Sequence, residues 1–182
     1  MTVHRADSTR VPLKYMAYWV KGPDGWKAVA YKRARAGEDI QPVSMPAALP
    51  AQMVTPVRDE ATLTRRAKSL QAAEQAFSDE AQIIGLGPAF QKWGSPDAVN
   101  MGGPSWIVGA DAIGRAIGAG SDGPSPVSWR AYRVVVASSG DLGVTFGRIR
   151  PNDSATLHEP GLPFFTIWRR AGPDAPWRYV AE

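Results

Sequence analysis

The chain contains, at residues 14–31, the stretch Lys14-Tyr-Met-Ala-Tyr-Trp-Val-Lys-Gly-Pro-Asp-Gly-Trp-Lys-Ala-Val-Ala-Tyr31. A second version of the same pattern stands at residues 164–181, as Phe164-Phe-Thr-Ile-Trp-Arg-Arg-Ala-Gly-Pro-Asp-Ala-Pro-Trp-Arg-Tyr-Val-Ala181. Each version is an apolar strand, a Gly-Pro-Asp turn and a return strand that begins with tryptophan. The paired tryptophans are 149 and 151 residues apart, which is about the length of one domain. The repeat therefore predicts the tail of one domain followed by a whole copy of that domain.

Working outward from these hairpins divides the chain into three parts. Residues 1–36 hold the first hairpin, which is either the remnant of a preceding domain or an appendage of the domain that follows. Residues 37–57 contain four prolines and little periodicity, which predicts an extended linker. Residues 58–182 form the main domain.

The main domain begins with helical periodicity and ends with strand periodicity. Apolar residues recur at steps of three and four between residues 58 and 84 and predict one long helix; they are Leu63, Ala67, Leu70, Phe77, Ala81 and Ile84. Ser78 is expected among the polar residues on the opposite side. Shorter helices are predicted up to Trp93 and over residues 111–117, and a short strand over residues 98–101. Residues 128–182 are rich in β-branched and aromatic residues between turns, which predicts an antiparallel sheet with helices on one face.

Composition excludes several classes of protein and site. The 182 residues include no cysteine, which excludes disulfides, thiolate nucleophiles and cysteine-based metal sites. No apolar run is long enough to span a membrane. The polar residues 1–10 precede no apolar signal core, so we expect a cytoplasmic protein.

Charged residues give no sign of a nucleic-acid or membrane partner. The net charge is +4 and the pI is about 9.6, but the basic residues are scattered and form no block or stripe. Two histidines make no metal site, and the pair His158-Glu159 is expected to be solvent-exposed. We therefore expect neither a metal nor a cofactor.

Residues 66–182 resemble the nuclear transport factor 2-like superfamily, and within it the SnoaL-like and ketosteroid isomerase-like proteins of bacteria. The resemblance rests on the order and spacing of several short segments, which are residues 73–77 (Ala-Glu-Gln-Ala-Phe), 89–93 (Ala-Phe-Gln-Lys-Trp), 95–99 (Ser-Pro-Asp-Ala-Val), 109–113, 139–147, 165–170 and 177–180.

The resemblance implies an α+β fold of the cystatin-like type, a cone in which a curved antiparallel sheet wraps a long N-terminal helix. It also implies a pocket open at one end of the cone and a homodimer formed through the sheet. The isomerases of the superfamily use an aspartate base with a tyrosine and an aspartic acid, and that set has no clear counterpart in this sequence. The resemblance therefore does not decide whether this chain is an enzyme.

Glu74 is the candidate catalytic residue. It falls inside the apolar stripe of the long helix, between Ala67 and Ala81. A carboxylate that faces a core has a raised pKa unless something pairs with it, which suits a general acid or base. The alternative is a structural glutamate bonded to an indole N–H or to an arginine.

Aromatic residues and one methionine could line a flat apolar pocket for a small apolar molecule. The candidates are Phe77, Trp93, Met101, Trp106, Trp129, Phe146, Phe164 and Trp168. The alternative for most of them is plain core packing. In the first strand of the second hairpin, Thr166 and Trp168 share one face while Phe165 and Ile167 share the other, so both faces should be covered, one by helices and the other by a second subunit.

These features predict a cofactor-independent isomerase, cyclase or hydrolase acting on a small apolar molecule. The alternative is a non-catalytic domain that binds a small ligand or dimerises. A cavity beside Glu74 would favour the enzyme, and a packed cone would favour the interaction domain.

Overall fold

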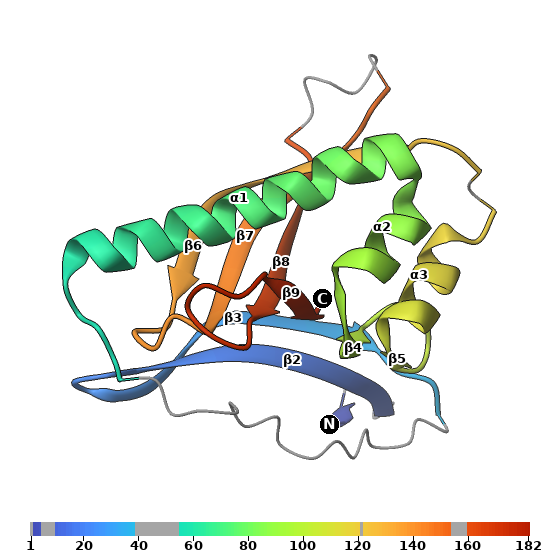
Figure 1. Cartoon of the computed structure of the whole chain (residues 1–182). Coiled ribbons are helices and arrows are strands. Elements are labelled where there is room, and N and C mark those ends of the chain that lie inside the picture. The colour runs from blue at the N-terminus through green and yellow to red at the C-terminus, as the bar shows by residue number, and fades with distance from the viewer. Residues whose placement is uncertain (1, 5–9, 39–54, 121, 154–159) are drawn as a thin grey trace.

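In a computed structural model, the chain forms three layers (Figure 1). The structure describes residues 2–4, 10–38, 55–120, 122–153 and 160–182. A six-stranded sheet is the middle layer, a long helix crosses one of its faces, and a β-hairpin covers the other. Most of the 37–57 linker, from residue 39 to residue 54, and the pair His158-Glu159 lie outside the described residues.

Helix α1 (Glu60–Ile84) is the long helix that periodicity predicts over residues 58–84. It begins where the Asp59 side chain accepts a hydrogen bond of 2.8 Å from the backbone N–H of Thr62, a typical N-cap. It ends at Gly85, whose φ of 91° lies in a region that side chains disfavour.

The buried side of α1 differs from the predicted stripe at Arg66, Ser78 and Ile84. Arg66 is buried outside the stripe, and its Nη1 donates a hydrogen bond of 2.7 Å to the carbonyl oxygen of Ser138. Ser78 is buried rather than facing solvent, because its hydroxyl accepts a hydrogen bond of 3.0 Å from the backbone N–H of Trp129. Ile84 is exposed, because the helix ends there. Leu70, Phe77 and Ala81 are buried as predicted.

Two short helices and two short strands follow α1. Helix α2 (Leu86–Trp93) leads directly into strand β4 (Gly94–Asn100), and strand β5 (Ile107–Val108) leads into helix α3 (Ala110–Gly118). The predicted short strand at residues 98–101 is thus the end of a longer one. Helices α2 and α3 lie together beside β4 and β5, next to one end of α1 (Figure 1).

The remaining strands of the large sheet are β6 (Val127–Val136), β7 (Leu142–Pro151), β8 (Leu162–Arg169) and β9 (Arg178–Ala181). The order across the sheet is β5-β4-β9-β8-β7-β6. Strands β6 to β9 are antiparallel as predicted, but β4 pairs parallel to β9, so the whole sheet is mixed. The fold is the expected α+β class.

The hairpin predicted at residues 11–33 consists of β2 (Arg10–Gly22) and β3 (Gly25–Arg35), with β1 (Thr2–His4) paired to β2. Gly22 and Gly25 are opposite each other across the tight turn. The second version of the pattern has a longer loop, because Arg169 pairs with Arg178 and Trp177 lies before the return strand.

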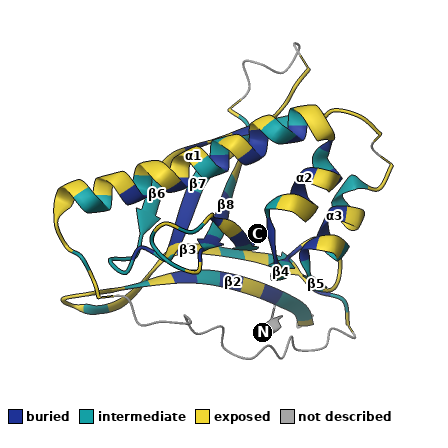
Figure 2. Cartoon of the chain, viewed as in Figure 1, coloured by how far each residue is buried: buried dark blue, intermediate teal, exposed yellow. Residues whose placement is uncertain are grey.

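Apolar residues fill both faces of the large sheet (Figure 2). The inner cluster lies between α1 and the sheet and includes Leu70, Phe77 and Trp168. The outer cluster lies between the sheet and the β2–β3 hairpin and includes Met16, Tyr18, Val144 and Phe165. This chain's own hairpin therefore covers the outer sheet face in the described structure. Association of two copies stays a prediction of the sequence. Most of the exposed aromatic residues belong to the hairpin, namely Tyr15, Trp19, Trp26 and Tyr31, and Tyr132 belongs to β6.

Candidate functional site

Glu74 lies at the centre of the inner layer, with none of its side chain exposed. Its Oε1 accepts a hydrogen bond of 2.7 Å from the indole N–H of Trp129. Its Oε2 accepts from the indole N–H of Trp168 at 2.9 Å and from the hydroxyl of Thr145 at 2.5 Å. One helix and three strands thus supply the carboxylate and its three donors, which is the structural alternative considered for this glutamate.

Burial raises the pKa of Glu74 above its ordinary value, while the hydrogen bonds from Thr145, Trp168 and Trp129 oppose that change. A second carboxyl group lies within electrostatic reach: burial, followed by the charge of Glu74, raises the pKa of Glu182 to about 8, and the charge of Lys32 opposes it. Oε2 of Glu182 is buried and has no hydrogen-bond partner within the described part of the chain. The layer thus holds two carboxyl groups for which protonation is favoured by folding.

This arrangement predicts how stability changes with pH. Folding raises the pKa of Glu182, so the protonated group contributes to the stability of the folded state. This contribution is fully present below pH 4.5, the ordinary pKa, and is lost as the pH rises through about 8. Thermal melts at pH 5 and pH 8.5 should show a drop in melting temperature that is smaller in Glu182→Gln than in the native protein. Glu38→Gln, which removes an exposed carboxylate, is the control. Equal drops in the native protein and Glu182→Gln would contradict the assignment.

Aromatic rings surround Glu74 and leave it no open side. Phe77 contacts the rings of four neighbours at centroid distances of 4.8–6.1 Å, namely Phe90, Trp129, Trp168 and Tyr179. Trp93 packs against Phe77 and Trp168. None of the five cavities described below is lined by Glu74. A substrate therefore finds no space beside the carboxylate in this conformation.

The predicted pocket residues do not lie together. Phe77, Trp93, Trp129, Phe164 and Trp168 belong to the inner cluster or pack against it. Met101, Trp106 and Phe146 belong to the outer cluster beneath the hairpin or pack against it. The sheet separates the two groups because neighbouring side chains of a strand point to opposite faces. The eight residues thus form two packed layers and not one pocket.

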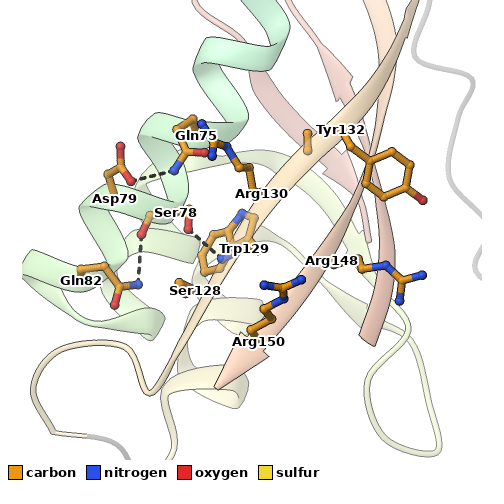
Figure 3. Close-up of a pocket in the computed structure, with 11 residues that line it drawn as sticks. Gln75, Ser78, Asp79, Gln82, Ser128, Trp129, Arg130, Tyr132, Arg148 and Arg150 are labelled. Carbon is orange, nitrogen blue, oxygen red and sulfur yellow. Dashed lines mark hydrogen bonds between the residues drawn. The ribbon is translucent and has the colours of Figure 1, made fainter. Parts of the chain in front are cut away.

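The cavities open around the rim of the domain. One of about 580 Å³ lies where α1 crosses β6 and β7 (Figure 3). Others of about 620 Å³ and 910 Å³ lie between α1 and the β8–β9 loop and beside the turn of the hairpin. Two smaller ones, of about 420 Å³ and 320 Å³, lie near Pro104 and near α3.

The cavity of Figure 3 gathers three arginines from two neighbouring strands. Arg130 of β6 is directly opposite Arg148 of β7, and Ser128 is directly opposite Arg150. Like charges in facing positions of a sheet destabilise it. No carboxylate of the described residues lies within 4 Å of these three guanidinium groups as an ion pair.

The other lining residues supply hydrogen-bonding groups and part of an apolar wall. Gln75 donates a hydrogen bond of 2.8 Å to Asp79, which engages the one carboxylate of the lining. Trp129, Ala131 and Tyr132 provide apolar surface. The arginines were noted in the sequence only as scattered charges, since Arg130 and Arg148 are 18 positions apart and only strand register places them together.

Within the described ranges, no group of histidine, aspartate or glutamate side chains could hold a metal ion. No described helix is both long enough and apolar enough to cross a membrane.

Comparisons with known proteins give structural likenesses. The chain is similar to a cystatin-like fold protein from Burkholderia xenovorans, with 21% identity, a TM-score of 0.44, and coverage of 64% of this chain and 88% of that chain. It is similar to a nuclear transport factor 2-like protein with a cystatin-like fold from Novosphingobium aromaticivorans, with 17% identity, a TM-score of 0.44, and coverage of 66% and 81%. A nuclear transport factor 2-like protein of unknown function from Pseudomonas putida gives 18% identity, a TM-score of 0.40, and coverage of 68% and 84%.

No protein-family model matches the chain, and no curated protein matches it. The comparisons name no activity for this chain.

Proposed function

We propose that residues 58–182 form a non-catalytic domain that binds a small anionic molecule in the cavity of Figure 3. The observation that carries this proposal is the set of three arginines from β6 and β7 that line one cavity of about 580 Å³. The Arg148 guanidinium also donates a hydrogen bond of 2.9 Å to the carbonyl oxygen of Gly161. Guanidinium groups bind carboxylates and phosphates through paired, charge-assisted hydrogen bonds. An anion between Arg130 and Arg148 would also relieve the repulsion between them.

The buried state of Glu74 supports binding without turnover. A general acid or base must come within hydrogen-bond reach of the reacting proton. Glu74 is enclosed by its three donors and lines none of the described cavities. The ligand proposed is an anion with an apolar part, in place of the apolar molecule expected from the sequence. The reason is that the cavity lining combines arginines with Trp129 and Tyr132.

Binding of benzoate and of inorganic phosphate tests this function. We expect benzoate to bind with a dissociation constant on the order of 1 mM, followed by amide chemical shifts of β6 and β7. The double variant Arg130→Gln and Arg148→Gln should weaken benzoate binding about tenfold.

The matched control is Arg33→Gln with Arg35→Gln, which removes the same charge from exposed positions of the hairpin. If this control still binds benzoate as the native protein does, the result supports the cavity as the binding site. Equal weakening in both double variants, or no saturable binding of either anion, would refute the proposed function.

A further inference from the structure

The two versions of the repeated pattern pack against each other through equivalent residues. Met16 and Tyr18 of the hairpin are 149 positions before Phe165 and Ile167, and Ala30 is 151 positions before Ala181. All of these side chains belong to the outer cluster or pack against it. The β2–β3 hairpin and its equivalent, the β8–β9 strand pair, therefore face each other, and each contributes the same side of its pattern to the outer cluster.

The opposite faces of the two versions have different surroundings. Trp168 and Trp177 lie beneath α1 and are 0% and 3% exposed. Their indole N–H groups donate to α1, to Glu74 at 2.9 Å and to Ser69 at 3.1 Å. The equivalent residues of the hairpin, Trp19 and Trp26, are 56% and 63% exposed. The same sequence pattern is therefore covered by a helix in one version and left open in the other.

The open side of the hairpin, which we call the aromatic face, carries the exposed side chains of Tyr15, Trp19 and Trp26. All three side chains are more than half exposed. Clusters of exposed apolar side chains on a single chain often mark interaction sites. A cavity of about 910 Å³, lined in part by Trp19, Trp26 and Leu142, continues this surface toward the β6–β7 turn.

Charges on the aromatic face have one sign. Lys21 is directly opposite Trp26, and Arg33 is directly opposite Tyr15, so both cations share this side of the ribbon with the rings. Two copies of the chain that met through this face would bring cations against cations. A partner with acidic side chains is complementary to it.

We propose that the aromatic face is a docking site for an amphipathic helix of another polypeptide. The helix would cover Trp19 and Trp26 as α1 covers Trp168 and Trp177. It would carry a carboxylate that accepts from the Trp19 indole N–H, in the role that Glu74 has at Trp168. Acidic residues at its margins would pair with Lys21 and Arg33. Docking of this kind uses apolar anchors at helical spacing in an apolar surface.

A synthetic peptide of residues 59–85 is the probe, because it contains the helix that covers the equivalent face and has more acidic than basic residues. Labelled with fluorescein and titrated with the native protein, it should show a saturable rise in anisotropy. The double variant Trp19→Ser and Trp26→Ser should bind it at least tenfold more weakly. The protein variant Leu162→Ser, which removes a 73% exposed apolar side chain from β8, should bind it as the native protein does.

Two further measurements decide the details of the proposal. The peptide with Glu74→Gln should bind more weakly than the native peptide, because it lacks the carboxylate that meets the indole. Sedimentation of the native protein should show no association that depends on Trp19. Absence of saturable binding, equal binding by the double variant, or Trp19-dependent self-association would each overturn the helix as the occupant. Because both tryptophans are exposed, their replacement should leave the fold intact. A circular dichroism spectrum of the double variant that matches the native one checks this.

Discussion

Glu74→Gln should lower the free energy of unfolding by about 1–3 kcal/mol. The carboxylate has two acceptor oxygens for three donors, and two of these donors are indole N–H groups. Glutamine keeps one acceptor and replaces the other with an NH₂ group. The Thr145 hydroxyl can rotate to accept a hydrogen bond, but an indole N–H cannot. If the amide nitrogen faces Trp129, the Trp129 indole N–H is buried and unpaired; if it faces Trp168, the Trp168 N–H keeps only its bond of 3.2 Å to the Thr145 hydroxyl oxygen.

A compensating effect makes the loss smaller than the sum of the broken bonds. Burial raises the pKa of Glu74, which means that the ionised carboxylate is itself costly to bury. Glutamine removes that cost, but the unpaired donor outweighs this gain because one indole N–H faces another donor at hydrogen-bond distance. Glu74→Leu should be more destabilising still, because it leaves the Trp129 indole N–H unpaired and leaves Trp168 and Thr145 only their longer hydrogen bonds, of 3.2 Å to the Thr145 hydroxyl and 3.3 Å to the Thr166 carbonyl oxygen.

Chemical denaturation measures this change in the free energy of unfolding, provided that its dependence on denaturant concentration is the same in both proteins. Glu60→Gln is the control on the same helix, since Glu60 is exposed. Native-like stability of Glu74→Gln would contradict a structural role. It would revive an acid–base role for this residue.

Local patterns were sufficient to predict the elements that position the site. The three- and four-residue spacing of Leu70, Phe77 and Ala81 predicted α1, and the Gly-Pro-Asp turn predicted the β2–β3 hairpin. The alternation of Phe165 and Trp168 predicted that both faces of β8 are covered, and the structure confirms it. These features depend on residues close together in the chain.

Features that depend on register and on packing between distant segments could not be predicted. Phe146 lies on the outer face because its neighbour Thr145 points to Glu74, which is 71 positions away in the chain. The opposition of Arg130 and Arg148 depends on the pairing of β6 and β7, which contains an irregularity between Ala131 and Arg133. Such an irregularity changes which side chains share a face.

The sequence also did not predict the polar attachment of the hairpin, to which one buried lysine contributes in addition to the outer cluster. Lys14 is buried, and its Nζ donates to the carbonyl oxygens of Gly103 at 2.8 Å, Ser105 at 2.6 Å and Gly102 at 3.4 Å. Burial lowers the pKa of Lys14, yet the carbonyl oxygens compensate for lost water. This side chain joins β2 to the loop between β4 and β5.

Lys14→Met should therefore cost about 2 kcal/mol of folding stability and loosen the hairpin. Methionine keeps an unbranched apolar stem, so the change removes the ammonium group with little loss of packing. The carbonyl oxygens of Gly103 and Ser105 then lose the ammonium donor that joins their loop to β2. Hydrogen exchange should quicken in β2 and β3 more than in β7 and β8, because the inner cluster is untouched.

Lys21→Met is the matched control, because Lys21 is exposed on the same strand. It should change neither the stability nor the exchange of the hairpin. If Lys14→Met left exchange in β2 and β3 unchanged, the apolar contacts of Met16 and Tyr18 with the sheet would suffice to hold the hairpin. Faster exchange would show instead that a buried charge fixes the ribbon to the sheet, and so holds the aromatic face in the orientation in which a helix could dock.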